Sequence, residues 1–202
     1  MLEPEPAVLD AVEFLATYRE GVLFADGTPM ARRFVSDPAS GRLLIPVSPE
    51  VTDAAEHVLH VPEESDDAMA LMVSVTMVHP DTLAACDRYL AYHGAAEEAR
   101  WIACQIEAAK WGGVVLDGAL LQRANPLAGV EGRLCKRANA DPARLAGAMR
   151  SHRNLDIPAA LCVGVDPGGL HVRSRFGVVR VRFARAAATE TEAVAAIEHF
   201  LS

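Results

Sequence analysis

The sequence predicts an α+β protein, in which a strand-rich first part is followed by a compact C-terminal module. Residues 26–48, DGTPMARRFVSDPASGRLLIPVS, contain two strand-length runs, Met30–Val35 and Arg42–Val47, with Asp-Pro-Ala-Ser-Gly between them. Residues 141–201 have the pattern of a helix, three strands and a helix, a module of about sixty residues. At 202 residues the chain is long enough for one large domain, or for a domain with a small appendage.

The first elements surround the two runs of residues 26–48. We expect a helix over Leu9–Tyr18 and a short strand over Val22–Phe24 before them. Pro38 fixes φ in the turn between the runs and Gly41 can take a positive φ, so the runs can pair as a hairpin. The elements expected after the hairpin are a helix-like stretch over residues 50–57, a short strand over 58–61, and an apolar strand over 68–78 that is buried on both faces.

The middle of the chain is expected to be mainly helical. One helix runs to Gly94 from a cap at Asp81, and a second covers Glu97–Lys110. The dipeptide Asp117-Gly118 predicts a hairpin, because Asp-Gly favours the type I′ turn. Residues 127–138 contain glycines and are expected to form a strand or a loop.

The C-terminal module carries the strongest local signals. Asp141-Pro142 is expected to begin a helix that runs to about His152, and Thr189 is expected to cap a last helix. The expected strands of the module are Ala160–Val165, Leu170–Ser174 and Val178–Phe183. We therefore expect two domains, residues 1–139 and residues 140–202.

The charge of the chain argues against a nucleic-acid partner. The net charge is −8, with −12 over residues 1–100 and +4 over residues 101–202. An anion site should therefore draw on the second half, or on the isolated pair Arg32 and Arg33. The start of the chain lacks the basic and apolar regions of a secretory signal, and no run reaches the length of a membrane span. We expect a soluble, cytoplasmic protein without membrane partners.

Common metal and catalytic motifs are absent from the sequence. The cysteines at 86, 104, 135 and 162 have no CxxC or Cys–His spacing, so no metal site is expected and buried free thiols are the simplest interpretation. The sequence has no GxGxxG, GK[ST], HExxH or GxSxG motif. No side chain is indicated as a general base, so the catalytic residues stay unknown.

Arginines are the main candidates for binding an anion. Arg32 and Arg33 point to opposite faces of their strand, so at most one can enter a site. Arg133 follows glycines in Gly-Val-Glu-Gly-Arg and can belong to an anion-binding turn or to a solvated loop. The C-terminal strands are expected to carry a basic stripe, or simply the wet face of a sheet, formed by Arg173, Arg175, Arg180, Arg182 and Arg185. His171 and His199 are candidate axial ligands if a haem binds.

The separate patterns together resemble a known group of proteins. The strand, G-x-P, strand, D-P-x-x-G, strand and Ser order resembles the opening of the split β-barrel of pyridoxamine 5′-phosphate oxidases and related flavin proteins. The segments VGVDPGGLHVR and VVRVRFARAAATETEAVAAI resemble the α-β-β-β-α module that follows such a barrel in haem-utilisation proteins. Gly132-Arg133 fits the Gly-x-Gly-Arg segment that lies between barrel and module in that group.

This resemblance implies a split β-barrel followed by a small αβββα module, and a homodimer with a flavin mononucleotide (FMN) or haem pocket at the subunit interface. It implies that Arg32 or Arg33 holds the flavin phosphate, that Ser48 lies near it, and that Arg133 meets the flavin or a haem propionate. The chain departs from the group after Ser48, where VTDAAEHVLHVPEESDDAM replaces a His-Thr-x-Asn segment.

Two functions follow from the resemblance. The first is an FMN-binding, oxidoreductase-like protein with a role in haem utilisation, in which the flavin supplies the redox chemistry. The alternative is a non-enzymatic dimer that binds haem or a partner protein and has lost the flavin site. The arginine pair favours the first, and the missing His-Thr-x-Asn segment favours the second. A barrel that binds no ligand is a third possibility.

Overall fold

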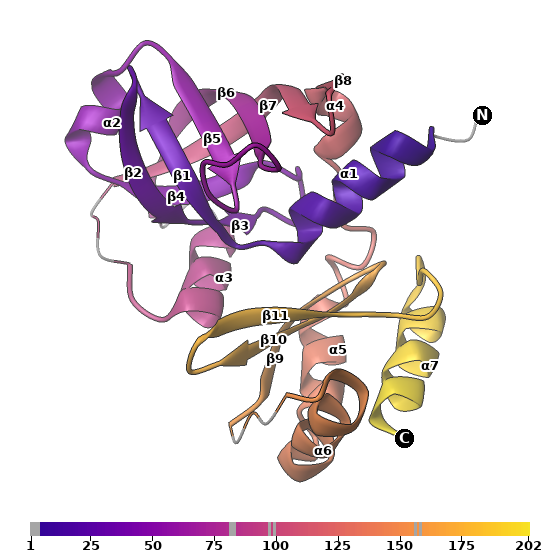
Figure 1. The fold of residues 1–202 in the computed structure, drawn as a ribbon. Helices are drawn as coiled ribbons and strands as arrows, with labels where there is room; N and C mark the ends of the chain where they lie inside the picture. Colours follow the sequence, from indigo (N-terminus) through magenta and orange to yellow (C-terminus); the bar gives the residue numbers. More distant parts are fainter. Residues whose placement is uncertain (1–4, 81–83, 97, 99, 156, 158) are drawn as a thin grey trace. The chain divides into compact units, whose positions relative to one another are not determined.

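The chain divides into two compact units, each with its own apolar core. The structure is a computed structural model that describes residues 5–80, 84–96, 98, 100–155, 157 and 159–202 (Figure 1). The units are Met1–Ala124 and Asn125–Ser202. The sequence had placed residues 125–139 with the first part, and a domain boundary after residue 139 stays a prediction.

The first unit is built on one antiparallel sheet that curls into a half-barrel (Figure 1). Within the described residues the sheet has eight strands, in the order β2-β1-β5-β6-β7-β4-β3, with β8 paired to β7. The strands are β1 (Glu20–Ala25), β2 (Thr28–Arg33), β3 (Val35–Ser36), β4 (Leu43–Val47), β5 (His57–Val61), β6 (Met69–Val78), β7 (Arg100–Trp111) and β8 (Val114–Asp117). The helices of this unit are α1 (Pro6–Thr17), α2 (Pro49–Asp53), α3 (Ala84–His93) and α4 (Gly118–Leu121).

The core of the half-barrel is aliphatic, as the low aromatic content of the chain requires. Side chains from every second position of the strands fill it, because successive residues of a strand point to opposite faces. Fully buried examples are Leu23, Ile45, Leu59, Leu71 and Ile102. Helix α1 closes part of this core with its buried residues Val8, Ala11 and Leu15.

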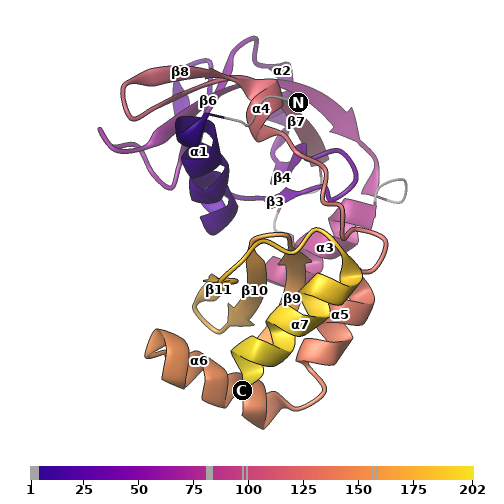
Figure 2. The ribbon, with the colours of Figure 1, turned by 90° about the vertical axis from the view of Figure 1, so that its right-hand side faces the viewer.

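The second unit is a three-stranded antiparallel sheet covered by helices. The strands lie in the order β11-β10-β9. Their bounds are β9 (Leu161–Asp166), β10 (Gly169–Ser174) and β11 (Gly177–Arg182), and the helices are α5 (Glu131–Ala138), α6 (Pro142–Arg153) and α7 (Glu190–Leu201). Helix α5 packs against α7 and against β9 (Figure 2). The chain is therefore an α+β protein in which a split β-barrel precedes a small module, as predicted.

The prediction that Met30–Val35 and Arg42–Val47 pair as a hairpin is largely wrong. Strand β2 pairs with β1, across a turn at Asp26 and Gly27 whose φ angles are 46° and 79°. Strand β4 pairs with β7, and only Val35–Ser36 pairs across the Asp37–Gly41 turn. Asp26-Gly27 supplies the two positive φ angles of a type I′ turn. This two-residue turn therefore joins the long β1–β2 hairpin, whereas the longer Asp37–Gly41 turn joins only a short one.

The second Asp-Gly pair does the opposite of what the sequence predicted. Asp117 ends β8 and caps α4, since its carboxylate accepts a hydrogen bond from the Ala119 amide. The chain reverses instead at Gly112 and Gly113, whose φ angles are 56° and 81°. Asp serves equally well as a helix cap and as a turn residue, so the dipeptide alone does not decide between them.

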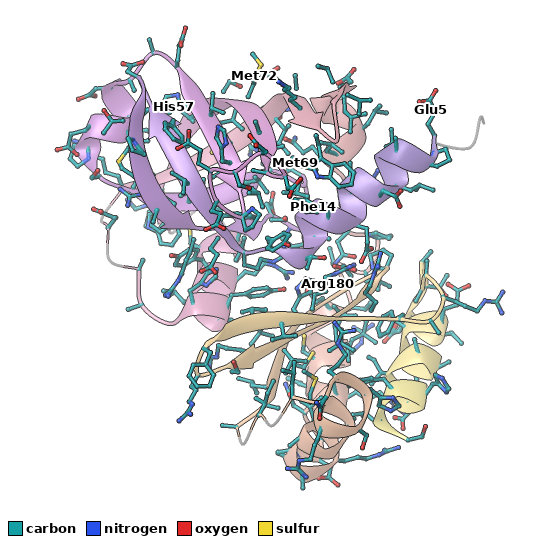
Figure 3. The ribbon with its side chains drawn as sticks, in the orientation of Figure 1. Glu5, Phe14, His57, Met69, Met72 and Arg180 are labelled. Atoms are coloured by element: carbon teal, nitrogen blue, oxygen red, sulfur yellow. The ribbon has the colours of Figure 1, made fainter. Side chains whose placement is uncertain are left out.

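Three further predictions in the middle of the chain are wrong. The helix expected over Glu97–Lys110 is strand β7 from Arg100 onwards, because it lies between β4 and β6 and burial in the sheet overrides helix propensity. Strand β6 is buried on one face only, and Met72 and Met77 are 58% and 66% exposed. The labelled side chain of Met72 points outward from the sheet (Figure 3). Residues 131–138 form helix α5. The cap expected at Asp81 lies outside the described residues.

The predictions for the C-terminal module are confirmed. Asp141 caps α6 with hydrogen bonds from the Ala143 and Arg144 amides. Thr189 and Glu192 form a reciprocal capping box at the start of α7. Among the described residues, no helix is long and apolar enough to cross a membrane.

Candidate functional sites

A polar pocket of about 620 Å³ lies at the open end of the β1–β2 hairpin, within the first unit. We call it the barrel pocket. Both Arg32 and Arg33 line it, although the sequence had indicated that only one could enter a site. Arg33 is the last residue of β2, so the pocket extends around the end of the strand. Its lining residues are Glu20, Gly21, Val22, Ala31, Arg32, Arg33, Pro46, Pro62, Glu63, Tyr89, Ala95 and Glu98.

The Arg32 guanidinium is already engaged by this chain. Its Nη1 donates to the Ala31 carbonyl at 3.0 Å, and its Nη2 lies 3.5 Å from the sulfur of Met30. The same Nη2 lies 3.7 Å from a carboxylate oxygen of Glu98. Only 17% of the Arg32 side chain is exposed, so little of it remains for a ligand. Arg33 is exposed, and it is the arginine that a ligand can reach.

The summed charge of the barrel pocket does not suit a phosphate. Two arginines face three carboxylates, Glu20, Glu63 and Glu98, which leaves a formal charge of −1. A phosphate monoester carries about −1.5 to −2 at neutral pH, so it would be repelled unless further cations were supplied. The residues of this chain alone therefore do not fit the phosphate of FMN.

Two residues of α3, Arg88 and Tyr92, form a cluster of cations and rings with Arg19, which precedes β1. Arg88 and Arg19 stack on the Tyr92 ring, at 4.7 Å and 5.9 Å from its centroid. The Nε2 atom of His93 lies 3.1 Å from the Phe34 carbonyl. Burial, together with the charges of Arg33 and Arg19, lowers the pKa of His93 to about 4, against the opposing effect of the Phe34 carbonyl. His93 is therefore neutral at physiological pH.

Ser48 lies elsewhere in the first unit. It precedes α2 as its N-cap residue, and it does not belong to the lining of the barrel pocket. Hydrogen bonds from the Glu50 amide and from Ser48 lower the pKa of Glu50. The geometry therefore assigns Ser48 to the start of a helix.

Arg133 and His171 are engaged within the second unit. Arg133 forms a two-point ion pair with Glu190, at 3.1 Å and 3.0 Å, on the solvent-exposed side of α5 and α7. His171 is 1% exposed, and its Nε2 lies 2.8 Å from Oδ2 of Asp166. For His171 to bind a haem iron through Nε2, its hydrogen bond to Asp166 would have to break.

Asp166 also accepts a hydrogen bond from Arg180 of β11, at 2.7 Å. Burial alone would raise the pKa of Asp166, but the hydrogen bonds and charges of His171 and Arg180 lower it well below its usual range. The three side chains form a compact ionic cluster that joins the three strands of the module.

An apolar pocket of about 500 Å³ lies within the second unit, between α6, α7 and the segment that joins β11 to α7. We call it the module pocket. One side of α7 forms a wall with Ala195, Ala196 and His199, whose small alanines leave the groove open. The full lining is His152, Val181, Phe183, Ala184, Arg185, Ala186, Ala187, Glu192, Ala195, Ala196, His199 and Phe200.

Two imidazoles and one cation stand among these apolar side chains. His152 packs on Phe200 with ring centroids 5.4 Å apart, which makes its ring part of the wall. His199 is exposed in the last turn of α7. The Glu192 carboxylate is occupied by Ala188 and Thr189 in the capping box, and hydrogen bonds from Thr189 lower its pKa. Arg185 supplies a positive charge at this pocket.

The sequence indicated part of both pockets. Arg32, Arg33 and His199 were candidates, whereas the three carboxylates of the barrel pocket and His152 of the module pocket were not. Glu20, Glu63 and Glu98 are far apart in the chain, and only the pairing of β1 with β2 and β5 brings the first of them beside the arginines. His152 lies in the last turn of α6, and no local signal distinguishes it.

No protein-family model matches the chain, and no curated protein matches it significantly. Among solved structures, the chain is similar to the crystal structure of the protein Atu2129 (unknown function) from Agrobacterium tumefaciens str. C58, with a TM-score of 0.75 and 18% identity over 100% of this chain and 98% of that one. The structure of a heme binding protein from Mycobacterium smegmatis covers the same shares, with a TM-score of 0.42 and 22% identity. The first likeness supports the fold alone, and the second is too low to support a conclusion.

Proposed function

We propose that this chain is a non-enzymatic haem-binding protein, and that the module pocket holds the haem. The observation that carries this proposal is an apolar pocket with an exposed imidazole, His199, and a cation, Arg185, among its lining residues. A haem would find three suitable features here: a nonpolar slot for the macrocycle, an imidazole that can ligate the iron, and positive charge for the propionates.

The residues of the pocket fit such a group in size and chemistry. Its volume of about 500 Å³ lies in the range of small-molecule and cofactor sites. Phe183 and Phe200 supply flat, apolar surface, and Ala195 and Ala196 keep one wall thin. We assign His199 as the axial ligand because it is exposed, and His152 as a wall residue because it packs on Phe200.

The flavin hypothesis has weaker support in this chain. Arg32 and Arg33 do line one pocket, but three carboxylates share it and Arg32 is engaged with Glu98. FMN binding there would need cations from a second subunit, so it depends on the homodimer that the resemblance implies. The predicted homodimer itself stays a proposal, which light scattering of the purified protein would test.

Absorbance titration of the purified protein with hemin and with FMN tests the proposal. Hemin should bind with one equivalent per chain and shift its Soret band, and FMN should not bind. Ala196→Trp should abolish the hemin response by filling the module pocket without removing a ligand. The matched control is Ala140→Trp, at an exposed position in the same unit, and it should bind normally.

Two results would contradict the haem proposal. Saturable FMN binding that Arg33→Ala abolishes, with no hemin response, would favour the flavin function. Hemin binding that is unsaturable, or that is equal in the two tryptophan variants, would show that the module pocket is not the site.

A further inference from the structure

Helix α5 attaches to the edge strand β9 through two of its side chains, Glu131 and Cys135, and through its C-cap residue Asn139. Glu131, Cys135 and Asn139 are spaced four residues apart, so their side chains follow one line along the helix. Strand β9 is at the edge of its sheet, where backbone N–H and C=O groups need partners other than a neighbouring strand. The side chains of α5 supply these partners.

Two hydrogen-bonded clamps fix the distance between α5 and β9. The Asn139 amide group accepts from the Cys162 N–H and donates to the Cys162 carbonyl, both at 2.8 Å. Nearer the start of α5, the buried Glu131 carboxylate accepts from the Val165 N–H at 2.8 Å. Cys135 lies midway between the two clamps in the helix, opposite the part of β9 that they hold.

The two thiols of this region are therefore held together. The Cys162 thiol can donate its one proton to the sulfur of Cys135, at 3.9 Å, or to the Gly164 carbonyl oxygen, at 3.5 Å. Cys162 is 3% exposed, while Cys135 is half-buried and can be reached from solvent. The hydrogen bond to Cys135 and burial raise the pKa of Cys162 well above its usual value, so Cys162 keeps its proton.

We propose that Cys135 and Cys162 are a peroxide-sensitive thiol pair, which closes to an intramolecular disulfide between α5 and β9. A disulfide bond is about 2.05 Å long, so rotation about the side-chain bonds has to bring the sulfurs together. The clamps at Glu131 and Asn139 keep the backbones in place while this happens. The site is independent of the haem proposal, because neither thiol belongs to the module pocket.

The oxidation proceeds in two balanced steps, with hydrogen peroxide as the oxidant. The Cys135 sulfur attacks one peroxide oxygen, the O–O bond breaks, and the thiol proton goes to the departing oxygen, so the products are the Cys135 sulfenic acid and one water. As the Cys162 sulfur then attacks the Cys135 sulfur, the Cys162 proton passes to the sulfenic oxygen, the S–O bond breaks, and the oxygen leaves as a second water. The two thiols lose two electrons in total, and peroxide gains them.

Peptide mass spectrometry of the whole chain tests this proposal. The folded protein is treated with hydrogen peroxide, denatured, alkylated and digested without reduction. We expect a linked peptide that joins Cys135 to Cys162, with the loss of two hydrogens and of two alkylatable thiols. Cys86 and Cys104 should stay alkylatable and serve as internal controls, because both are buried and burial raises their pKa values.

Three variants distinguish a pre-positioned pair from chance oxidation. Cys162→Ser should accumulate sulfenic acid on Cys135, detected with a dimedone probe, and Cys135→Ser should leave Cys162 reduced. Asn139→Ala should slow disulfide closure roughly tenfold, since one clamp is lost, without slowing the first oxidation. Circular dichroism confirms that each variant is folded.

The proposal is overturned by any of three results. These are sulfinic acid on Cys135 without a linked peptide, links between separate chains in place of the internal one, or equal oxidation of Cys86 and Cys104.

Discussion

Asp166 shows how one partly buried side chain can organise a small module. Its carboxylate receives His171 and Arg180 from two other strands and also accepts from the Gly168 amide at 2.7 Å. Both partners are nearly inaccessible to solvent, at 1% and 5% exposure. Such a group stabilises the fold only while it is complete, because a single buried charge without its partner is costly.

Asp166→Asn should therefore lower the free energy of unfolding of the module by about 3 kcal/mol. The amide keeps the size of the side chain but leaves the Arg180 charge uncompensated. Urea unfolding followed by circular dichroism measures the change, and Glu190→Gln, which breaks an exposed ion pair, is the control that should change little.

The same cluster makes the stability of the module fall at low pH. The folded pKa of Asp166 lies below its unfolded value of about 3.9, so its stabilisation is complete above that pH and is lost as the pH falls below it. The wild type should lose stability below about pH 4 more steeply than Asp166→Asn. Equal slopes would contradict this account of the cluster.

His93 provides a test of the electrostatics near the barrel pocket. Burial and the positive charges of Arg33 and Arg19 together lower the pKa of His93 to about 4, against the opposing effect of the Phe34 carbonyl. Arg33→Ala should therefore raise the pKa of His93, which NMR of the imidazole ring measures directly. Arg42→Ala is a matched control that should leave the titration in place. An unchanged pKa in Arg33→Ala would show that Arg33 does not act on this site.

This titration also affects stability. Because the folded pKa of His93 is below the unfolded value of about 6.5, the unfolded state binds more protons between these values. The stability of the first unit should fall as the pH drops from about 6.5 to 4, and less so in His93→Gln, whose amide can still donate to Phe34.

Glycines in the helices have opposite roles, and substitution separates them. Gly147 lies inside α6 with open space where an added methyl group would stand, so Gly147→Ala should raise the free energy of unfolding by about 1 kcal/mol. Gly118 begins α4 against the Ile106 carbonyl, and Gly118→Ala should lower it by about 1–3 kcal/mol. Urea unfolding measures the free energy of unfolding of both variants. If both substitutions raised it, or both lowered it, the packing described for one of the glycines would be wrong.

The elements that the sequence predicted well carry strong local signals. Thr189 with Glu192, and Asp141 with Pro142, specify the starts of α7 and α6 within a few residues. The elements that it missed depend on distant partners. Strand β7 forms because β4 and β6 flank it, and the two Asp-Gly pairs differ only in what surrounds them. An Asp-Gly pair by itself does not show whether the Asp will cap a helix or sit in a turn, because its carboxylate can accept backbone hydrogen bonds in both.

At the scale of the whole chain, hydrogen exchange tests whether α5 belongs to the second unit. Helix α5 is clamped to β9 by Asn139 and Glu131, so its amides should share the hydrogen-exchange protection of β9–β11. Exchange measured through a urea series should show α5 opening with these strands. Opening together with β6 and β7 would instead favour a boundary after residue 139.

The candidate sites were predictable to a lesser degree than the fold. The sequence singled out Arg32, Arg33 and His199 by residue type, and the structure places them at two pockets in different units. The charges that make the barrel pocket unsuitable for a phosphate come from three segments that only the fold brings together. The apolar walls around His199 likewise come from α6, α7 and the segment after β11. Pocket composition, and hence the choice between flavin and haem, required the structure.

The most direct test of the haem proposal is the dissociation constant for hemin in three proteins: the wild type, His199→Ala, and His79→Ala as an exposed-histidine control in the first unit. Titration followed at the Soret band should give at least about tenfold weaker binding for His199→Ala, because the axial nitrogen is lost. His79→Ala should bind as the wild type does. Equal dissociation constants for the wild type and His199→Ala would contradict the assignment of His199 as the axial ligand and, with it, the proposed site.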